Sequence, residues 1–231
     1  VALGKDLNEA WERAFDCDPI SAFGGIVAFN GKIEKELAEK LKEIFLEVIV
    51  SPEIEEEALK VLSSKKNLRV LSLKIQKERK GFDFKRVSGG FLIQEWEEHE
   101  EKMEDFKVVT KNSPTELQWK DLIFAWKVVK NIKSNGILFA KNLQTLGIGS
   151  GQTSRVDSVK VAAMKAKLPL EESVCASDGF FPFPDGVEEI YKAGGRTIIA
   201  PGGSIKDKEV IEKANALGIS MVFSPCRHFR H

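Results

Sequence analysis

The sequence has neither a net charge nor a long apolar run. Its 231 residues carry 35 basic and 35 acidic side chains, so charge gives no support to nucleic acid or an acidic membrane as the main partner. No apolar run approaches the ~20 residues that cross a bilayer. The first residues lead into a polar helical pattern, and they lack the features of a signal peptide. We therefore expect a cytoplasmic chain with no membrane or nucleic-acid partner.

Cysteine is scarce as well. Cys17, Cys175 and Cys226 are odd in number, far apart and without zinc-ligand spacing, which argues against a disulfide framework or a zinc site. The sequence contains no Pro-Cys-x-x-Cys, and its single His-x-Glu, at 99–101, therefore lacks the second motif that zinc deaminases need to activate water. A zinc nucleoside deaminase is therefore disfavoured, and we expect no zinc.

The composition, 42% hydrophobic and 30% charged, allows one large or two small domains with proper cores. Helical and strand patterns alternate along the chain, which predicts an α/β fold with a largely parallel sheet covered on both faces. An acidic, irregular stretch at 94–105 marks a boundary, so we expect domains at 1–105 and 106–231. Helices are expected at 5–17, at 52–62 with Pro52 at its start, from a capping box at Ser113 and Glu116, and at 154–167, 184–193 and 207–217.

A glycine-rich turn at 147–155 reads Gly-Ile-Gly-Ser-Gly-Gln-Thr-Ser-Arg. It follows a strand pattern and opens a helix, where free backbone amides favour anions and Arg155 adds a forked donor set. It is neither a Walker loop nor a good dinucleotide fingerprint. The alternative is a tight connection that carries a surface arginine.

Three further segments could bind a ligand. Residues 176–186 read Ala-Ser-Asp-Gly-Phe-Phe-Pro-Phe-Pro-Asp-Gly, a stiff aromatic loop suited to stacking on a flat heterocycle, or alternatively a buried hydrophobic turn. Pro-Gly-Gly-Ser at 201–204 lies between a strand and a helix. The tail at 227–231, Arg-His-Phe-Arg-His, could receive a phosphate, or it could be a solvated basic end.

The joint order of these motifs is more specific than any one of them. Together with Ser-Asn at 134–135 and Cys-Asp-Pro-Ile-Ser-Ala-Phe-Gly-Gly at 17–25, they closely resemble the transformylase family that formylates 5-aminoimidazole-4-carboxamide ribonucleotide (AICAR). That family usually forms the C-terminal part of a bifunctional enzyme whose other half is an IMP cyclohydrolase. The resemblance covers nearly the whole chain. It implies two cytidine-deaminase-like three-layer α/β/α units, the first incomplete here, in a homodimer with sites at the interface.

The resemblance implies transfer of a formyl group from 10-formyltetrahydrofolate, a reduced-folate co-substrate, to the 5-amino group of AICAR in purine (IMP) biosynthesis. By position, Asn135 and Arg155 would be the catalytic residues that hold the carboxamide of AICAR. Phe180 would pack on the imidazole, and Arg227 would meet the phosphate. This interpretation requires Asn135, Arg155 and Phe180 to close around one flat ligand.

Other roles carried over from the family are more peripheral. Gly24 and Glu47 would lie near the ribose, although the family often has Asp at the second position. A monovalent cation, described for some members, would lie near Ser134 and Asp178, but here Gly136 and His228 stand at neighbouring positions. The folate pocket would be lined by Ile20, Val156, Pro182, Phe183, Gly202 and Gly203.

One family motif is missing. Lys-His-x-Asn-Pro-Cys-Gly, which supplies the general acid–base histidine and its lysine partner, should lie immediately before Val1, and no Lys-His pair occurs in the 231 residues. We therefore expect a fragment of a longer enzyme that is inactive or severely impaired alone. Two other hypotheses are a non-catalytic nucleotide-binding module of the same fold and a structural dimerisation domain.

Overall fold

The structure, a computed structural model, describes residues 1–74, 81–95 and 102–230. His99, His231 and half of the acidic stretch at 94–105 lie outside the described residues. The chain forms two compact units: Val1–Phe23 together with Met103–His231, and Gly24–Lys102. This grouping differs from a division after residue 105, because the first 23 residues belong with the second half of the chain.

The larger unit contains a six-stranded sheet in the order β10-β9-β11-β12-β13-β8. β11, β12 and β13 pair in parallel, whereas β10–β9, β9–β11 and β13–β8 pair antiparallel. The prediction of a largely parallel sheet is therefore wrong for β9 and β8, which run opposite to the other four strands; β9 does so because a turn at Asn142 and Leu143 joins it directly to β10. The strands are β8 (Lys107–Val108), β9 (Ile137–Lys141), β10 (Gln144–Gly149), β11 (Ser173–Ser177), β12 (Gly195–Pro201) and β13 (Ser220–Ser224).

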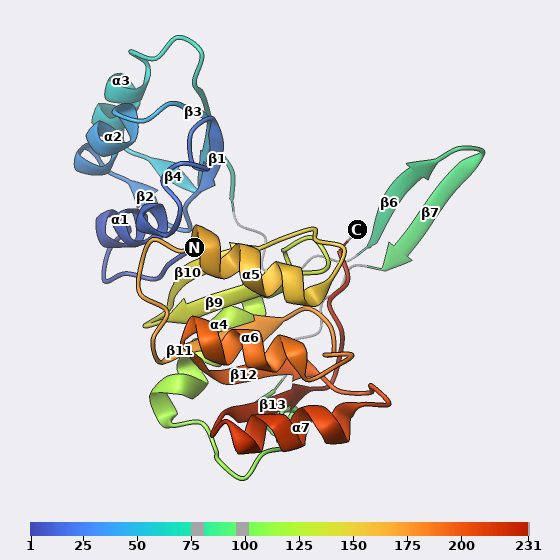
Figure 1. The fold of residues 1–231 in the computed structure, drawn as a ribbon. Coiled ribbons are helices and arrows are strands. Elements are labelled where there is room, and N and C mark those ends of the chain that lie inside the picture. The colour runs from blue at the N-terminus through green and yellow to red at the C-terminus, as the bar shows by residue number, and fades with distance from the viewer. Residues whose placement is uncertain (75–80, 96–101, 231) are drawn as a thin grey trace. The chain divides into compact units, whose positions relative to one another are not determined.

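Helices cover both faces of this sheet, as the sequence predicts. α5 (Arg155–Lys165), α6 (Asp185–Ala193) and α7 (Asp207–Ala216) lie side by side over one face (Figure 1). The other face is covered by α4 (Glu116–Val129). Because side chains alternate along a strand, Phe139 packs in the core with α5–α7 and its neighbour Leu138 packs against α4. The larger unit is thus a three-layer α/β/α structure.

The first helix also belongs to the larger unit. α1 (Leu7–Cys17) is capped by Asp6, whose carboxylate accepts a hydrogen bond from the Glu9 amide at 2.8 Å. The side-chain amide of Gln144 on β10 donates to the Arg13 carbonyl at 2.7 Å. α1 is thereby joined to the β10 edge of the sheet.

Local signals predict most helix ends correctly. Ser154 caps α5, accepting from the Asp157 amide at 3.1 Å, and α6 ends at Gly194, whose φ of +113° suits glycine. The capping box predicted at Ser113 is wrong by two residues. Thr115 and Gln118 form the box, because they fit the same Ser/Thr-x-x-Glu/Gln pattern and the helix begins one position after Thr115.

The smaller unit contains a parallel three-stranded sheet in the order β1-β3-β5. The helix predicted from Pro52 begins four residues later, because residues 53–54 pair as a short strand with residues 32–33. β6 and β7 form a separate antiparallel hairpin. The elements are β1 (Gly25–Ala28), β2 (Lys32–Ile33), α2 (Lys35–Lys42), β3 (Leu46–Ser51), β4 (Glu53–Ile54), α3 (Glu56–Leu62), β5 (Arg69–Ser72), β6 (Phe82–Val87) and β7 (Gly90–Glu95), followed by a 3-10 turn at Met103–Asp105 in the larger unit.

Among the described residues, none of the helices combines the length and the apolar character needed to span a bilayer.

Candidate functional site

The candidate ligand-binding motifs of the second half lie together at one end of the strands of the six-stranded sheet, and we call this end the sheet edge. β10 and β11 are both antiparallel to β9, so β10, β11, β12 and β13 all point the same way. Their carboxyl ends therefore meet at one edge, where β9 begins. The segments at 134–136, 150–154, 178–184, 202–206 and 225–230 all lie at this edge. Open α/β sheets bind ligands at the carboxyl ends of their strands.

Arg155 lies at the centre of this edge and is almost fully buried, with 8% of its surface exposed. Its Nη1 atom donates to Ser177 Oγ at 2.7 Å and to Asp178 Oδ1 at 2.5 Å, and its Nη2 atom donates to Asn135 Oδ1 at 3.0 Å. The position in the first turn of α5 follows from the Ser154 cap. The alternative of a surface arginine is therefore wrong.

Asn135 is held between α5 and the glycine-rich turn. Its Nδ2 atom donates to the carbonyl oxygens of Gln152 at 2.9 Å and Thr153 at 3.3 Å. Its own carbonyl accepts from Ser158 Oγ at 2.8 Å. The side-chain oxygen of Asn135 consequently faces Arg155, and the half-buried amide has a defined orientation.

Asp178 is fully buried, and each of its carboxylate oxygens has a hydrogen-bond donor. Oδ1 accepts from Arg155, and Oδ2 accepts from Ser134 Oγ at 2.5 Å. We call Ser134, Asn135, Arg155, Ser177 and Asp178 the Arg155 cluster. The guanidinium balances the charge of Asp178, and the monovalent cation that the family resemblance implies near Ser134 and Asp178 stays a prediction. The described residues contain no group of three or more His, Cys, Asp or Glu placed to hold a metal ion.

Phe180 follows the Arg155 cluster directly along the chain. A side chain at Gly179 would lie 2.6 Å from Arg155 Nη2, so the backbone leading to Phe180 passes against the guanidinium. The Arg227 guanidinium carbon lies 4.7 Å from the centre of the Phe180 ring. Arg227 also reaches Gly203, where a side chain would lie 3.2 Å from its Nη2 atom. Arg155, Phe180 and Arg227 therefore belong to neighbouring segments of one edge.

The tail that carries Arg227 is built into the larger unit. The His228 amide donates to the Asp178 carbonyl at 3.0 Å, and the Arg230 carbonyl accepts from the Ser134 amide at 2.9 Å. The His228 ring is buried against Trp126, with ring centres 4.3 Å apart. The backbone of the tail is therefore held in the larger unit and His228 is buried, whereas the side chains of Arg227 and Arg230 are exposed, as a solvated basic end would have them.

The residues expected to line a folate pocket have varied surroundings. Val156 is half-buried in the first turn of α5, Pro182 and Phe183 are exposed before α6, and Ile20 is exposed after α1. Gly202 has no room for a side chain, because one would lie 2.7 Å from the Phe223 ring. Five of the six, all except Ile20, follow the carboxyl ends of β10, β11 or β12. Their role as a pocket stays a prediction.

Two expected ribose contacts lie in the smaller unit. Gly24 has a φ of +72°, and its amide donates to the Phe45 carbonyl at 2.8 Å at the entry to β1. Glu47 is exposed on β3. Their part in the site stays a prediction.

Sequence reasoning missed the ion pair of Asp178 with Arg155. From the sequence, Asp178 is expected only in the aromatic loop and beside a monovalent cation, and Ser177 and Ser158 have no individual role. A signal was present, because Asp178 ends a buried strand pattern and a carboxylate at such a position needs a charged partner. Cys175 on β11 is not a candidate nucleophile, since burial raises the pKa of its thiol.

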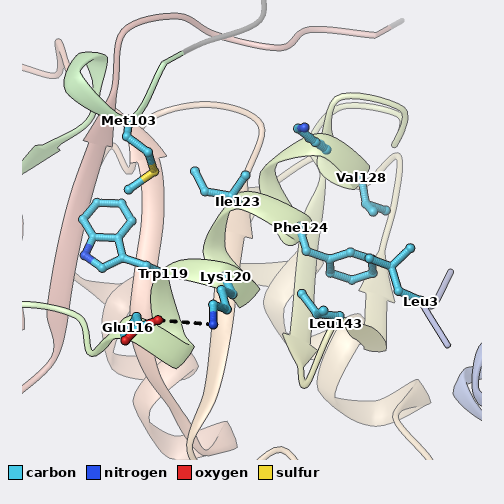
Figure 2. A pocket seen from close by; sticks show the side chains of 10 residues that line it. Leu3, Met103, Glu116, Trp119, Lys120, Ile123, Phe124, Val128 and Leu143 are labelled. Atoms are coloured by element: carbon cyan, nitrogen blue, oxygen red, sulfur yellow. Dashed lines mark ion pairs between the residues drawn. The ribbon is translucent and has the colours of Figure 1, made fainter. Parts of the chain in front are cut away.

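Two cavities lie elsewhere in the larger unit. The larger, about 620 Å³, is a groove over α4, and we call it the α4 groove (Figure 2). Its wall is mostly apolar, and the Glu116–Lys120 ion pair of 3.3 Å is part of its lining. A second cavity of about 400 Å³ lies between the end of α1, β10 and α5, next to the Asp18–Lys165 ion pair. The α4 groove contains none of the expected site residues. It is lined by Leu3, Met103, Glu116, Trp119, Lys120, Ile123, Phe124, Lys127, Val128 and Leu143.

Comparisons with known proteins agree with the family resemblance. The model of the family described as "AICARFT/IMPCHase bienzyme" matches residues 1–165. The chain is 51% identical over 235 residues to the bifunctional purine biosynthesis protein PurH of Caldicellulosiruptor bescii, covering 100% of this chain and 45% of that protein. The PurH protein of Aquifex aeolicus is 52% identical over 234 residues, with 100% and 46% covered. The chain thus spans less than half the length of these relatives, and it belongs to the AICARFT/IMPCHase bienzyme family.

Proposed function

We propose that this chain is the substrate-binding part of a formyltransferase of purine (IMP) biosynthesis. The reaction moves the formyl group of 10-formyltetrahydrofolate to the 5-amino group of AICAR. The observation that carries the proposal is the 3.0 Å contact between Arg155 Nη2 and Asn135 Oδ1, at the sheet edge where Phe180 and Arg227 also lie. The family membership and the PurH relatives support it.

The Arg155 cluster suits the carboxamide of AICAR. The 5-amino group is a poor nucleophile, because its lone pair is conjugated with the ring and the carboxamide. A fixed guanidinium and a fixed amide can hold the carboxamide in one orientation and stabilise the charge that develops as the amine attacks the formyl carbon. Arg155 and Asn135 are held by protein groups before a ligand arrives, so little reorganisation is needed.

Phe180 and Arg227 suit the remaining parts of the nucleotide. An aromatic ring can pack on the imidazole, and an exposed guanidinium can pair with the phosphate. The folate would lie along the first turn of α5, which contains Val156, and along the loops that contain Phe183 and Gly203. Flat protein walls on both sides of the two bound ligands would exclude water, which competes with the amine for the formyl group.

The proton-transfer group would come from outside these residues. As an amine attacks a formyl carbon, a base must remove the amine's proton and an acid must protonate the departing folate nitrogen. His228 is buried against Trp126, and its backbone amide is used by Asp178. We therefore propose that the family's Lys-His pair is supplied by a segment that is not in this chain.

The same proposal includes a more specific assignment of the fold. The strand order β10-β9-β11-β12-β13, with an antiparallel first pair, one helix on one face and three on the other, supports a cytidine-deaminase-like unit. The smaller unit would be part of a second such unit, and both would belong to a cytoplasmic homodimer with sites at its interface.

Binding experiments on the chain test the proposal. AICAR and a non-reactive folate analogue are titrated into the chain separately and together by calorimetry, and formyl transfer is assayed with and without the Lys-His segment attached. We expect AICAR binding that strengthens the binding of the folate analogue, with turnover only when the segment is attached. Arg196→Ala serves as a control, because Arg196 pairs with Glu172 at the opposite edge of the sheet.

Each outcome has a defined meaning. A chain that does not bind AICAR contradicts the proposal. A chain that binds AICAR without any coupling to the folate analogue favours the alternative, a non-catalytic nucleotide-binding module. Robust turnover by the 231 residues alone refutes the external proton-transfer group.

A further inference from the structure

Asp178 joins four segments of the chain at the sheet edge. Its carboxylate contacts Arg155 and Ser134, its amide donates to the Gly136 carbonyl at 3.2 Å, and its carbonyl accepts from the His228 amide at 3.0 Å. It is fully buried, and the ion pair with Arg155 is 2.5 Å long. The carboxylate is therefore fixed in place by the fold, independently of any ligand.

Asp178 also determines how Arg155 is presented. An arginine side chain is long and flexible, but its guanidinium is a rigid plane. Asp178 and Ser177 hold Nη1, which leaves Nη2 directed at Asn135. If the carboxylate were neutral, Nη1 would lose its charged partner and the plane could rotate about the remaining contacts.

We propose that Asp178 is the positioning residue of the site: its carboxylate fixes the guanidinium of Arg155 so that Nη2 and the Asn135 amide receive the carboxamide of AICAR together. Asp178 does not touch the substrate. The inference rests on the proposed function, because it concerns the same nucleotide, and it assigns the orientation of the site to a residue outside the substrate contacts.

Asp178→Asn tests this role, because asparagine keeps the shape and removes the charge. AICAR affinity of the chain should fall by about tenfold or more, the equivalent of losing one charge-assisted hydrogen bond. The affinity for a folate analogue should stay within about twofold, because the hydrogen-bond partners of the Arg155 side chain are Ser177, Asp178 and Asn135, none of which is expected to line the folate pocket. Calorimetric titration of both ligands gives, for each ligand, the ratio of the affinity of the variant to that of the unaltered chain. Circular dichroism confirms that the variant is folded.

A double-mutant cycle separates positioning from a general structural role. If Asp178 acts through Arg155, the double variant Asp178→Asn with Arg155→Gln should bind AICAR no more weakly than Arg155→Gln alone. A merely structural role would make the two losses additive and would weaken folate-analogue binding in parallel. Either of those results overturns the proposal.

Ser134→Ala keeps the proposal testable if Asp178→Asn does not fold. It removes one hydrogen bond from Asp178 and leaves the buried ion pair, so AICAR affinity should fall by roughly threefold. Ser173→Ala is the matched control. Ser173 is a buried serine at the opposite end of β11, its hydroxyl has no hydrogen-bond partner among the described residues, and its replacement should leave AICAR affinity unchanged. Equal effects from the two serines would contradict the assignment.

Failure of this inference can be told from failure of the proposed function. The unaltered chain reports on the function, because it either binds AICAR or does not. The ratio between the variant and the unaltered chain reports on positioning. An unaltered chain that binds AICAR and an Asp178→Asn variant that is folded and binds equally well would leave the function standing and reject the role of Asp178.

Discussion

The Arg155 cluster and the α4 groove are two very different parts of the larger unit. The groove is the more spacious, at about 620 Å³, and its wall is mostly apolar. The cluster is almost closed, yet it brings a buried guanidinium, a carboxylate and an amide within hydrogen-bonding distance of one another. In the proposed function, the chemistry of this unit lies where buried polar groups converge, and the size of a cavity is a poor guide to it.

The largest expected effect follows from Arg155→Ala. It should abolish AICAR binding and lower the free energy of unfolding by about 3–5 kcal/mol, because Asp178 is left buried without its partner. Chemical denaturation and calorimetric titration measure the two losses. Arg196→Ala, the arginine at the opposite edge, should leave AICAR affinity within about twofold of the parent. A stable Arg155→Ala variant with normal AICAR affinity would contradict the contrast drawn between the Arg155 cluster and the α4 groove.

Arg227→Ala should separate the phosphate from the rest of the nucleotide. Its side chain is exposed, so stability should change by less than about 0.5 kcal/mol, while affinity for AICAR falls roughly tenfold. Affinity for the nucleoside without phosphate should be unchanged. Arg230→Ala, in the same tail and hydrogen-bonded to Asn131, is the control. Equal losses for nucleotide and nucleoside would place Arg227 away from the phosphate.

Trp119→Ala tests the α4 groove, the second of the two regions compared. Trp119 lines the α4 groove and is half-buried, so its removal should cost about 1–2 kcal/mol of stability and leave AICAR affinity within about twofold. Thermal unfolding and titration provide the two values, and Lys127→Ala is a control on the same groove. A large loss of AICAR affinity would give the groove a part in substrate binding.

The smallest effect concerns Asp18 beside the second cavity. Burial acts to raise the pKa of its carboxyl, but hydrogen bonds from Ser21 and the nearby Lys165 outweigh it and hold that pKa below its ordinary value. The stabilisation is present above the unfolded-state pKa of about 3.9 and is lost as pH falls through the lower folded value. Asp18→Asn should therefore be slightly less stable than the parent at pH 7, with a difference that vanishes in acid. A difference independent of pH in denaturation curves would exclude this cause.

Much of the fold could be predicted from the sequence because its signals are local. Ser154 and Asp157 predicted the start of α5, and Gly194 predicted the end of α6. The direction of β9 and β10 could not be predicted from alternation, because it depends on the Asn142–Leu143 turn. Two backbone amides of that turn are held by the buried carboxylate of Asp121 on α4, a contact between distant parts of the chain.

The site was partly predictable for the same reason. Arg155 and Asn135 stood out by motif, and the structure places them in contact. Asp178 and Ser177 were not predicted as their partners, because the pairing depends on the register between β9 and β11, which brings Ser177 opposite Ile137. Periodicity predicts that a strand exists, and long-range pairing decides which side chains meet at its end.

The Arg155 cluster contributes both to the proposed site and to the stability of the larger unit. This affects how variants of this enzyme family should be interpreted. Ser158, Arg155 and Asp178 tie α5, β9, β11 and the C-terminal tail together, so Arg155 and the residues that hold it also complete the folding of the larger unit. Under the proposed function, genetic screens that score growth without purines would therefore recover mutations here for two reasons, faulty chemistry and low protein yield. Measuring the amount of folded protein beside growth is the way to separate an impaired catalyst from a scarce one.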